Sequence, residues 1–336
     1  MSKAILKASA DVLGTLHVDA FLTNFSEAYV QDQRNFISNV AATNIPVLKE
    51  SDKYVIYPRG YFWRDEVKVR PLGGRPDQAN YKVTNGNYNA EEWALEHVVD
   101  DRQRANTDAP IRLDQNATLL LTQKQMIRSD RIWAANFFTT GIWTHNAVGG
   151  TDFVRFDAAN SDPIGVIDEY KEAIFQVTGF MPNRLILGAQ VKKTLRTHAD
   201  IADRIKYTRT GVADEEILAA LFEIEQVRTA RSIYNASAET TAADGGFDGT
   251  YIVDPAGMWM GYIAPSAALD TPTAIARFSW NGLIPGATNQ FGGVMQRGRD
   301  DRAHSDYFQN RTAYEQKVVS ADLGCFFSSV TGALSN

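Results

Sequence analysis

Apolar residues recur at helical spacing through one long stretch near the middle of the chain. This stretch, from Asp114 to Gly141, contains no proline and no earlier glycine. Two rows of apolar residues repeat every seven positions: Leu113, Leu120, Ile127 and Ala134 in one, and Leu119, Met126 and Trp133 in the other. On a helix these rows lie side by side as one wide apolar stripe. The pattern predicts a helix over 114–140, roughly 40 Å long, with Asp114 as its N-terminal cap and Gly141 closing its last turn.

Charged residues interrupt this stripe and limit what the helix can be. Lys124, Arg128 and Asp130 fall within it, and because buried charge is costly in lipid, the helix does not read as a membrane span. The repeat is not sustained over further heptads, which argues against a coiled coil. We interpret the helix as a spine along which sheet elements or other subunits pack. A long core helix of an ordinary enzyme fits the same pattern.

A second unusual stretch precedes the helix, between residues 59 and 92. Two strand-like runs flank Gly73-Gly74, and Asn85-Gly86 is a further tight-turn signal. The runs predict a two-stranded hairpin with little apolar mass to bury, and such a hairpin is only marginally stable alone. It must therefore lie on another surface, of its own domain or of a neighbouring subunit, and its length favours the neighbour.

The remaining pattern predicts a mixed chain of helices and strands. Residues 19–40 carry apolar side chains at roughly helical spacing and form an N-terminal arm. Ser161-Asp162-Pro163 opens a helix that Gly179 stops. Shorter helices are expected at 190–196, 201–207 and 217–222. Strands are expected at 54–61, 93–99, 185–187, 227–234, 251–253, 258–263, 274–280, 304–308 and 314–321, with a polar loop at 100–110 and irregular chain at 285–299.

Composition narrows the class of protein. The chain has 336 residues, 44% of them hydrophobic, and a net charge of −6. These values are ordinary for a globular protein and exclude a basic nucleic-acid binder overall. No apolar run reaches membrane-spanning length. The single cysteine, Cys325, rules out an intrachain disulfide, and its apolar neighbours predict that it is buried.

Catalytic and metal-binding patterns are scarce. No phosphate loop, dinucleotide fingerprint or nucleophile elbow is present, and the histidines lack metal-ligand spacing. We therefore predict no catalytic residue, no metal and no cofactor. If the protein were a cytosolic enzyme with a site between two domains, the best candidates would be His198 with Asp200, or Asp100 with Asp101. Solvated loop ends and helix caps are the favoured interpretation of these acids, and a salt-bridged turn that of Arg297, Arg299 and Arg302.

One segment carries a family resemblance. PNRLILGAQVKKTLRTHADIADRIKYT, followed by GVADEEILAALFEIEQVRTARSIYN, spans Pro182 to Asn235. Its order of strand, short helix, His-Ala-Asp-Ile turn, Arg-Ile-Lys-Tyr segment, acidic helix start and Ile-Tyr-Asn resembles major capsid proteins of tailed bacteriophages with the HK97 fold. The resemblance implies an α+β fold with an N-terminal arm (1–45), an extended hairpin loop (59–92), a peripheral domain (46–58, 93–148 and 300–336) that contains the spine helix, and an axial domain (149–299).

The same resemblance implies a function. The chain would assemble through pentamers and hexamers into an icosahedral shell around phage double-stranded DNA, within the host bacterial cytoplasm, and remain in the virion. Its expected partners are itself, a separate scaffolding protein, a portal and a cement protein, with non-specific DNA contact and no membrane. The negative net charge suits a shell that must not bind its DNA tightly. An encapsulin-like compartment is the alternative within this class.

The hairpin and the arm supply the candidate contact residues. Those expected to meet neighbouring subunits are Phe62, Trp63, Arg64, Val67, Val69, Arg70, Leu72, Arg75, Tyr81, Phe25 and Tyr29. The chain shows no long N-terminal scaffolding region, so we expect a separate scaffold or a sequence already in its mature form. No motif identifies a partner for Lys68 or Lys82, so we expect no isopeptide cross-link between subunits.

Overall fold

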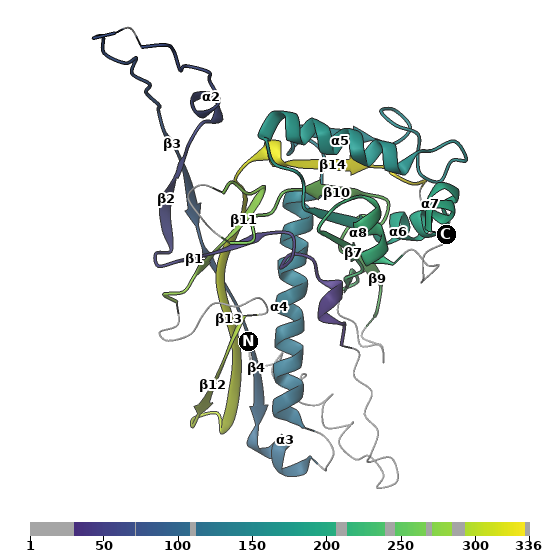
Figure 1. Ribbon diagram of the computed structural model, residues 1–336. Helices are drawn as coiled ribbons and strands as arrows, with labels where there is room; N and C mark the ends of the chain where they lie inside the picture. Colours follow the sequence, from purple (N-terminus) through teal and green to yellow (C-terminus); the bar gives the residue numbers. More distant parts are fainter. Residues whose placement is uncertain are drawn as a thin grey trace.

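Two sheets share one long helix in the computed structural model of the chain (Figure 1). The structure describes residues 30–70, 72–107, 112–205, 214–238, 246–266, 271–283 and 293–332. The long helix, α4 (Leu113–Phe137), runs down the middle of the view, with one sheet beside its length and the other across its upper end. A loop extends away from the body at the upper left.

Helix α4 confirms the predicted spine, with corrections at both ends. Asp114 does not cap it. The residue lies inside the first turn, where its carboxylate binds Arg104 at 2.7 Å. The helix ends at Phe137, where the N–H of Phe138 still donates to the carbonyl of Ala134. Gly141 has a positive φ of 84° but lies beyond the helix end. At 25 residues, the helix is roughly 38 Å long.

The buried face of α4 differs in part from the predicted stripe. Met126 and Trp133 are buried as expected, but Leu119 and Leu120 are 48% and 44% exposed. Polar side chains are buried in the same helix, among them Ser129 and Asp130. The stripe was wrong at its lower end because only the sheet side of the helix is covered there by described residues.

The first sheet lies along α4. Its strands are β1 (Thr43–Val47), β11 (Ile275–Trp280), β13 (Ser305–Val318), β12 (Val294–Asp300) and β4 (Glu91–Asp100). The long strand β13 pairs with β4 on one side and with β12 and β11 on the other. Val99 and Phe308 from this sheet pack against Ala117 and Leu121 of α4 in a small apolar cluster.

The second sheet holds the larger core. Its order is β5 (His145–Val148), β14 (Gly324–Ser328), β10 (Met258–Gly261), β6 (Arg184–Gly188) and β7 (Gln226–Ala230). The helices that pack around it are α5 (Pro163–Thr178), α6 (Ala189–Thr197), α7 (Ala199–Ile205) and α8 (Glu215–Leu221). Cys325 is fully buried in this core, as predicted, and burial raises the pKa of its thiol.

Two short ribbons complete the description. One pairs β2 (Ser51–Ile56) with β3 (Thr84–Asn89), and the other pairs β8 (Ile233–Asn235) with β9 (Gly249–Tyr251). Short helices are η1 (Gln33–Asn35), α2 (Arg59–Phe62), α3 (Asp101–Asn106) and η2 (Ala321–Leu323). The predicted turn at Asn85-Gly86 is wrong, because both residues lie within β3. A Cβ at Gly86 would fall 2.3 Å from the ring of Tyr54, so the glycine makes room for that ring.

Local signals were reliable in some segments and not in others. Helix α5 begins with Asp162 accepting the N–H of Gly165 and ends at Gly179, whose φ is 68°, as predicted. The described part of the arm is not a helix to Val40, since only η1 is helical there. The expected loop at 100–110 contains α3, and residues 294–300 form β12. The strands expected at 304–308 and 314–321 are one continuous strand, β13.

Sheet pairing crosses the predicted domain boundaries. Strands β11 and β12 were assigned to the axial domain, yet they pair in the sheet that contains β4 and β13. Strand β14 was assigned to the peripheral domain, yet it lies between β5 and β10 in the other sheet. The chain therefore passes between the two sheets more often than a division by sequence position suggests.

Candidate functional site: the projecting loop

The projecting loop, residues 63–83 between α2 and β3, rises from a well-packed base. The β2–β3 ribbon carries it, and Tyr54 and Tyr88 of that ribbon stack on Phe278 of the first sheet. The ring centroids lie 5.3 Å and 4.7 Å apart. Offset aromatic pairs of this kind stabilise a contact beyond simple burial. The base is thus fixed to the body although the loop itself is not.

A second anchor joins the loop base to the other sheet region. Arg59 of α2 binds the carboxylate of Asp322 at 2.6 Å, and the hydroxyl of Thr144 donates to the same carboxylate. Trp63 lies over the C-terminal end of α5, where a Cβ at Gly179 would be 3.2 Å from the indole. These contacts orient the loop relative to both sheets before any partner binds.

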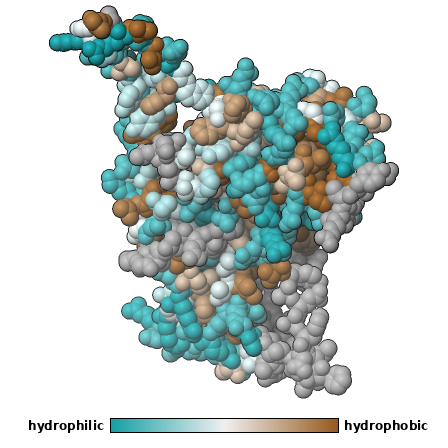
Figure 2. Space-filling view, in the orientation of Figure 1, coloured by the Kyte–Doolittle hydropathy of each residue, from teal (hydrophilic) through white to brown (hydrophobic). Residues whose placement is uncertain are grey.

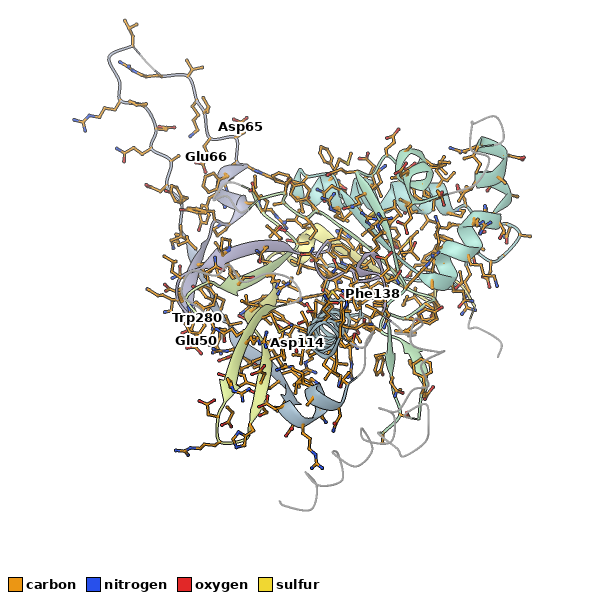
Figure 3. All side chains as sticks on the ribbon, turned by 90° about the horizontal axis from the view of Figure 1, so that it is seen from below. Glu50, Asp65, Glu66, Asp114, Phe138 and Trp280 are labelled. Carbon is orange, nitrogen blue, oxygen red and sulfur yellow. The ribbon has the colours of Figure 1, made fainter. Side chains whose placement is uncertain are left out.

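Beyond these anchors every described residue of the loop except Gly74 is exposed (Figure 2). Val67, Val69 and Leu72 are 92%, 96% and 108% exposed. Figure 3, seen from below, shows Asp65 and Glu66 on the loop, away from the body. Apolar side chains this exposed bury little surface within the subunit. Binding to another surface would cover them and would be favourable.

Three aromatic rings gather where the loop leaves its base. Tyr57, Phe62 and Tyr81 lie with ring centroids 5.4 to 6.1 Å apart, and each ring residue is between 43% and 59% exposed. Aromatic side chains are over-represented among the residues that carry binding energy at protein interfaces. The cluster was only partly predicted, since Phe62 and Tyr81 were named as contact candidates and Tyr57 was not.

The loop is also rich in cations. Two of them pair within the loop, Arg64 with Glu66 at 3.9 Å and Lys68 with Asp77 at 3.1 Å. Arg70 and Arg75 make no ion pair with any residue that the structure describes. Exposed pairs such as these contribute little to stability, so the cations remain available to a partner surface.

The predicted contact residues thus divide into two groups. Those of the hairpin are brought together on one exposed element, and they are Phe62, Trp63, Arg64, Val67, Val69, Arg70, Leu72, Arg75 and Tyr81. Phe25 and Tyr29 lie outside the described residues. Sequence reasoning missed the anchors Arg59, Asp322 and Gly179. No local signal could have revealed them, because they lie far apart in the chain and meet only in the fold.

The enzyme candidates are held in structural contacts. His198 Nε2 lies 2.9 Å from the hydroxyl of Ser161, and its Nδ1 is 3.9 Å from the carboxylate of Asp200. This resembles a serine–histidine–aspartate arrangement, but the hydroxyl of Ser161 is buried and donates to the carbonyl of Ala158 at 2.7 Å. A hydroxyl committed to a carbonyl in a buried turn is not a free nucleophile. Ser161 and His198 therefore stabilise the turn at residues 158–161.

The other acidic candidates belong to a salt-bridge network at the far end of the first sheet. Asp306 accepts from Arg104 at 2.6 Å and from Arg297 at 2.8 Å, and Arg299 reaches it at 3.3 Å. Hydrogen bonds from Arg297 and Arg104 lower the pKa of Asp306 far below its usual range. Asp101 binds Arg299 at 2.6 Å, and Asp100 accepts the N–H of Arg102 as the cap of α3. The cap is confirmed at Asp100, and Arg297 and Arg299 are salt-bridged as predicted, whereas the side chain of Arg302 forms no ion pair with a described residue.

No other described feature forms a conventional site. Among the described ranges, no cluster of three potential metal ligands occurs, and no helix there is long and apolar enough to cross a membrane. A cleft of about 430 Å³ lies between α4 and the first sheet, lined by Trp93, Arg128 and Tyr314 among others. It contains neither His198 nor Asp101, so the enzyme candidates do not converge on it.

Comparison with known proteins identifies the architecture. No protein-family model matches the chain. It is 29% identical over 223 residues to the major capsid protein of Burkholderia phage BcepMu, a match that covers 65% of this chain and 70% of that protein. The crystal structure of a phage-related protein from Bordetella bronchiseptica superposes with a TM-score of 0.67 at 18% identity, covering 90% of this chain and 95% of that one.

Two further structures share the fold at lower identity. The capsid of cyanophage P-SCSP1u has a TM-score of 0.57 at 10% identity, with 93% of both chains covered. An encapsulin from Synechococcus elongatus has a TM-score of 0.55 at 9% identity, with 96% of this chain and 99% of that one covered. The long spine helix, the two sheets and the projecting loop therefore define the HK97-like fold of shell proteins.

Among proteins of this fold, the chain is similar in sequence to a phage major capsid protein. The chain therefore has the mixed α+β HK97-like fold that is found in phage capsid proteins.

Proposed function

We propose that this chain builds a closed icosahedral shell of pentamers and hexamers around phage double-stranded DNA, and that the projecting loop supplies the main contact between neighbouring copies. The observation that carries the proposal is the contrast within the loop. Its base is anchored through Arg59 and Trp63, whereas Val67, Val69 and Leu72 are fully exposed. A pre-oriented element with an uncovered apolar end suits binding to another surface, because little ordering is required on association.

Approximate energetics support such a contact. Full burial of one aliphatic side chain contributes about 1.5–3 kcal/mol, and the loop offers three. Association costs translational and rotational freedom, so one such contact alone would be weak. In a symmetric assembly every copy donates one loop and receives another, and many modest contacts together close a stable shell.

The finer parts of the proposal follow from the resemblance to capsid proteins. The peripheral region comprises α4 with the sheet of β4 and β13, and the axial region comprises the sheet of β6 and β10 with its helices. The partners are other copies of this chain, a scaffolding protein, a portal and a cement protein. The net charge of −6 suits non-specific contact with packaged DNA without tight binding.

A protein compartment without a genome is the second candidate. It is favoured by one observation, the coverage of 96% of this chain by the encapsulin fold. The two candidates differ in what the shell encloses, because an encapsulin-like shell would hold protein cargo.

The contents of isolated particles test the function. Particles purified after expression with the full set of phage assembly genes are expected to be closed shells that protect double-stranded DNA from added nuclease. Closed shells that enclose protein and no DNA would support the compartment. A protein that never forms particles under these conditions would contradict both.

A further inference from the structure

The chain that follows the N-terminal segment is held along α4 by a buried carboxylate. Asp130 accepts the backbone N–H of Ile37 at 3.1 Å and that of Ser38 at 2.9 Å. Further toward the N-terminus, the N–H of Gln31 donates to the side chain of Gln123 at 3.2 Å. Residues 31–38 therefore run along α4 in the same direction as the helix, from beside Gln123 to beside Asp130.

The described end of this segment is fixed on its other side as well. The side-chain amide of Gln31 donates to the carbonyl of Ile233 at 2.7 Å and accepts its N–H at 3.0 Å. Gln31 thus bridges α4 and β8. The direction of the described chain is set at this point, and its first residue, Val30, precedes the one that binds Gln123.

An uncovered apolar ledge lies just beyond that point. Leu119 is one helical turn before Gln123 and in the same row, since Leu119, Gln123 and Asp130 are four and seven positions apart. Leu119 is 48% exposed and its neighbour Leu120 is 44% exposed. The apolar stripe predicted from the sequence thus continues past the place where the described covering segment ends.

We propose that residues 18–29 of the same chain bind this ledge as an amphipathic helix. Val18, Leu22, Phe25 and Tyr29 recur at four, three and four positions, the spacing of one helical face. Such a helix would be roughly 17 Å long from Val18 to Tyr29, close to the roughly 15 Å of α4 from Gln123 back to Leu113. We assign the segment to the ledge of its own chain, because Tyr29 is joined directly to Val30 and no linker is available to reach another subunit.

This assignment gives Phe25 and Tyr29 an intrachain role in place of the contact with a neighbouring subunit that the resemblance suggested. The proposal does not rest on shell assembly, because the ledge and the hydrogen bonds from Ile37 and Ser38 to Asp130 belong to one subunit. The projecting loop is then the element left to reach a neighbour.

A cysteine pair tests the proposal in the unassembled full-length chain. Phe25→Cys with Leu119→Cys is expected to form a disulfide within one chain under mild oxidation, seen as a faster-migrating monomer on a non-reducing denaturing gel. The matched control is Phe25→Cys with Lys124→Cys, because Lys124 is exposed about 140° further round α4. Cys325 is buried and should not interfere.

Each other outcome overturns the proposal. A disulfide-linked dimer would show that the segment binds the ledge of a second copy. Equal cross-linking of the test and control pairs, or none in either, would show that the segment does not bind at Leu119.

Hydrogen exchange gives a measurement that needs no cross-link. Replacing Leu119 and Leu120 together by serine is expected to speed amide exchange across residues 18–29 about tenfold, the effect of about 1.4 kcal/mol of lost binding. The amides of Ile37 and Ser38 should keep their protection, since Asp130 still binds them. Unchanged exchange across 18–29 would contradict the inference.

Discussion

The carboxylate of Asp130 accepts the backbone N–H of Ser38 at 2.9 Å in the interior of the subunit. The same carboxylate accepts the hydroxyl of Ser232 at 2.9 Å. One acidic side chain in the middle of α4 thus joins the end of the arm, the spine helix and the segment before β8. Burial raises the pKa of Asp130, and the hydrogen bonds from Ser38, Ser232 and Ile37 act in the opposite direction.

Replacing this side chain should be costly. Asp130→Ala leaves the N–H groups of Ile37 and Ser38 buried without an acceptor, so we expect the free energy of unfolding to fall by about 2–4 kcal/mol. Denaturant unfolding of the unassembled subunit measures this free energy of unfolding. Glu172→Ala, at an exposed position of α5, is the control and should change stability by less than about 0.5 kcal/mol. A similarly small change for Asp130→Ala would show that the hydrogen bonds to this carboxylate contribute little to the stability of the subunit.

Acid should weaken the salt-bridge network at Asp306. Its pKa is lowered in the folded state, chiefly by hydrogen bonds from Arg297 and Arg104, so its stabilising effect is present above the unfolded pKa of about 3.9 and is lost as the pH falls below that value. The variant Asp306→Asn should be less stable than the wild type near neutral pH, and the difference should shrink between about pH 5 and about pH 3.

Parallel unfolding curves of the two proteins across this range provide the measurement. Asp301→Asn is the matched control, because Asp301 binds Arg299 at 3.2 Å but its side chain is 91% exposed. A stability difference for Asp306→Asn that is constant with pH would exclude a charge effect at this carboxylate.

Elements of this fold were predicted from the sequence where the residues that determine them lie close together along the chain. Helix α5 was predicted with its cap and its stop because Asp162, Pro163 and Gly179 act on their own neighbours. Asn85-Gly86 misled for the opposite reason, since the glycine is required by the ring of Tyr54 on the paired strand. A pattern of turn residues cannot reveal a side chain that arrives from elsewhere in the chain.

The candidate site shows the same division. Exposure of Val67, Val69 and Leu72 was expected from a hairpin too poor in apolar mass to have its own core. The hairpin itself was wrong, because the described residues of 63–83 form no strand and the ribbon below them pairs β2 with β3. The anchor between Arg59 and Asp322 joins residues from opposite ends of the chain, and no local pattern marks it. The family resemblance supplied the overall architecture, which periodicity alone left open between a shell protein and an enzyme.

The loop tip should matter for assembly and not for the stability of the subunit. Serine at Val67, Val69 and Leu72 together should leave the free energy of unfolding within about 0.5 kcal/mol, because these side chains are already exposed. Particle yield should fall sharply because the buried apolar area at the contact is lost. Leu48→Ser, at an 88% exposed position outside the loop, is the control. Full particle yield from the triple variant would remove the loop from the proposal.

Subunits should remain uncross-linked in mature particles. Lys68 is exposed and paired with Asp77 at 3.1 Å, whereas a nucleophilic lysine needs a desolvated or otherwise activated amine. Boiled particles on a denaturing gel should give one band at the monomer mass of 37.3 kDa. A ladder of multiples would show that a lysine–asparagine bond forms after all.

Electron microscopy of the purified protein, with sedimentation velocity alongside, tests the central claim most directly. The account predicts closed shells, or rings of five and six copies that close into shells when a scaffolding protein is added. A homogeneous monomer or dimer that never assembles, with or without a scaffold, would contradict it.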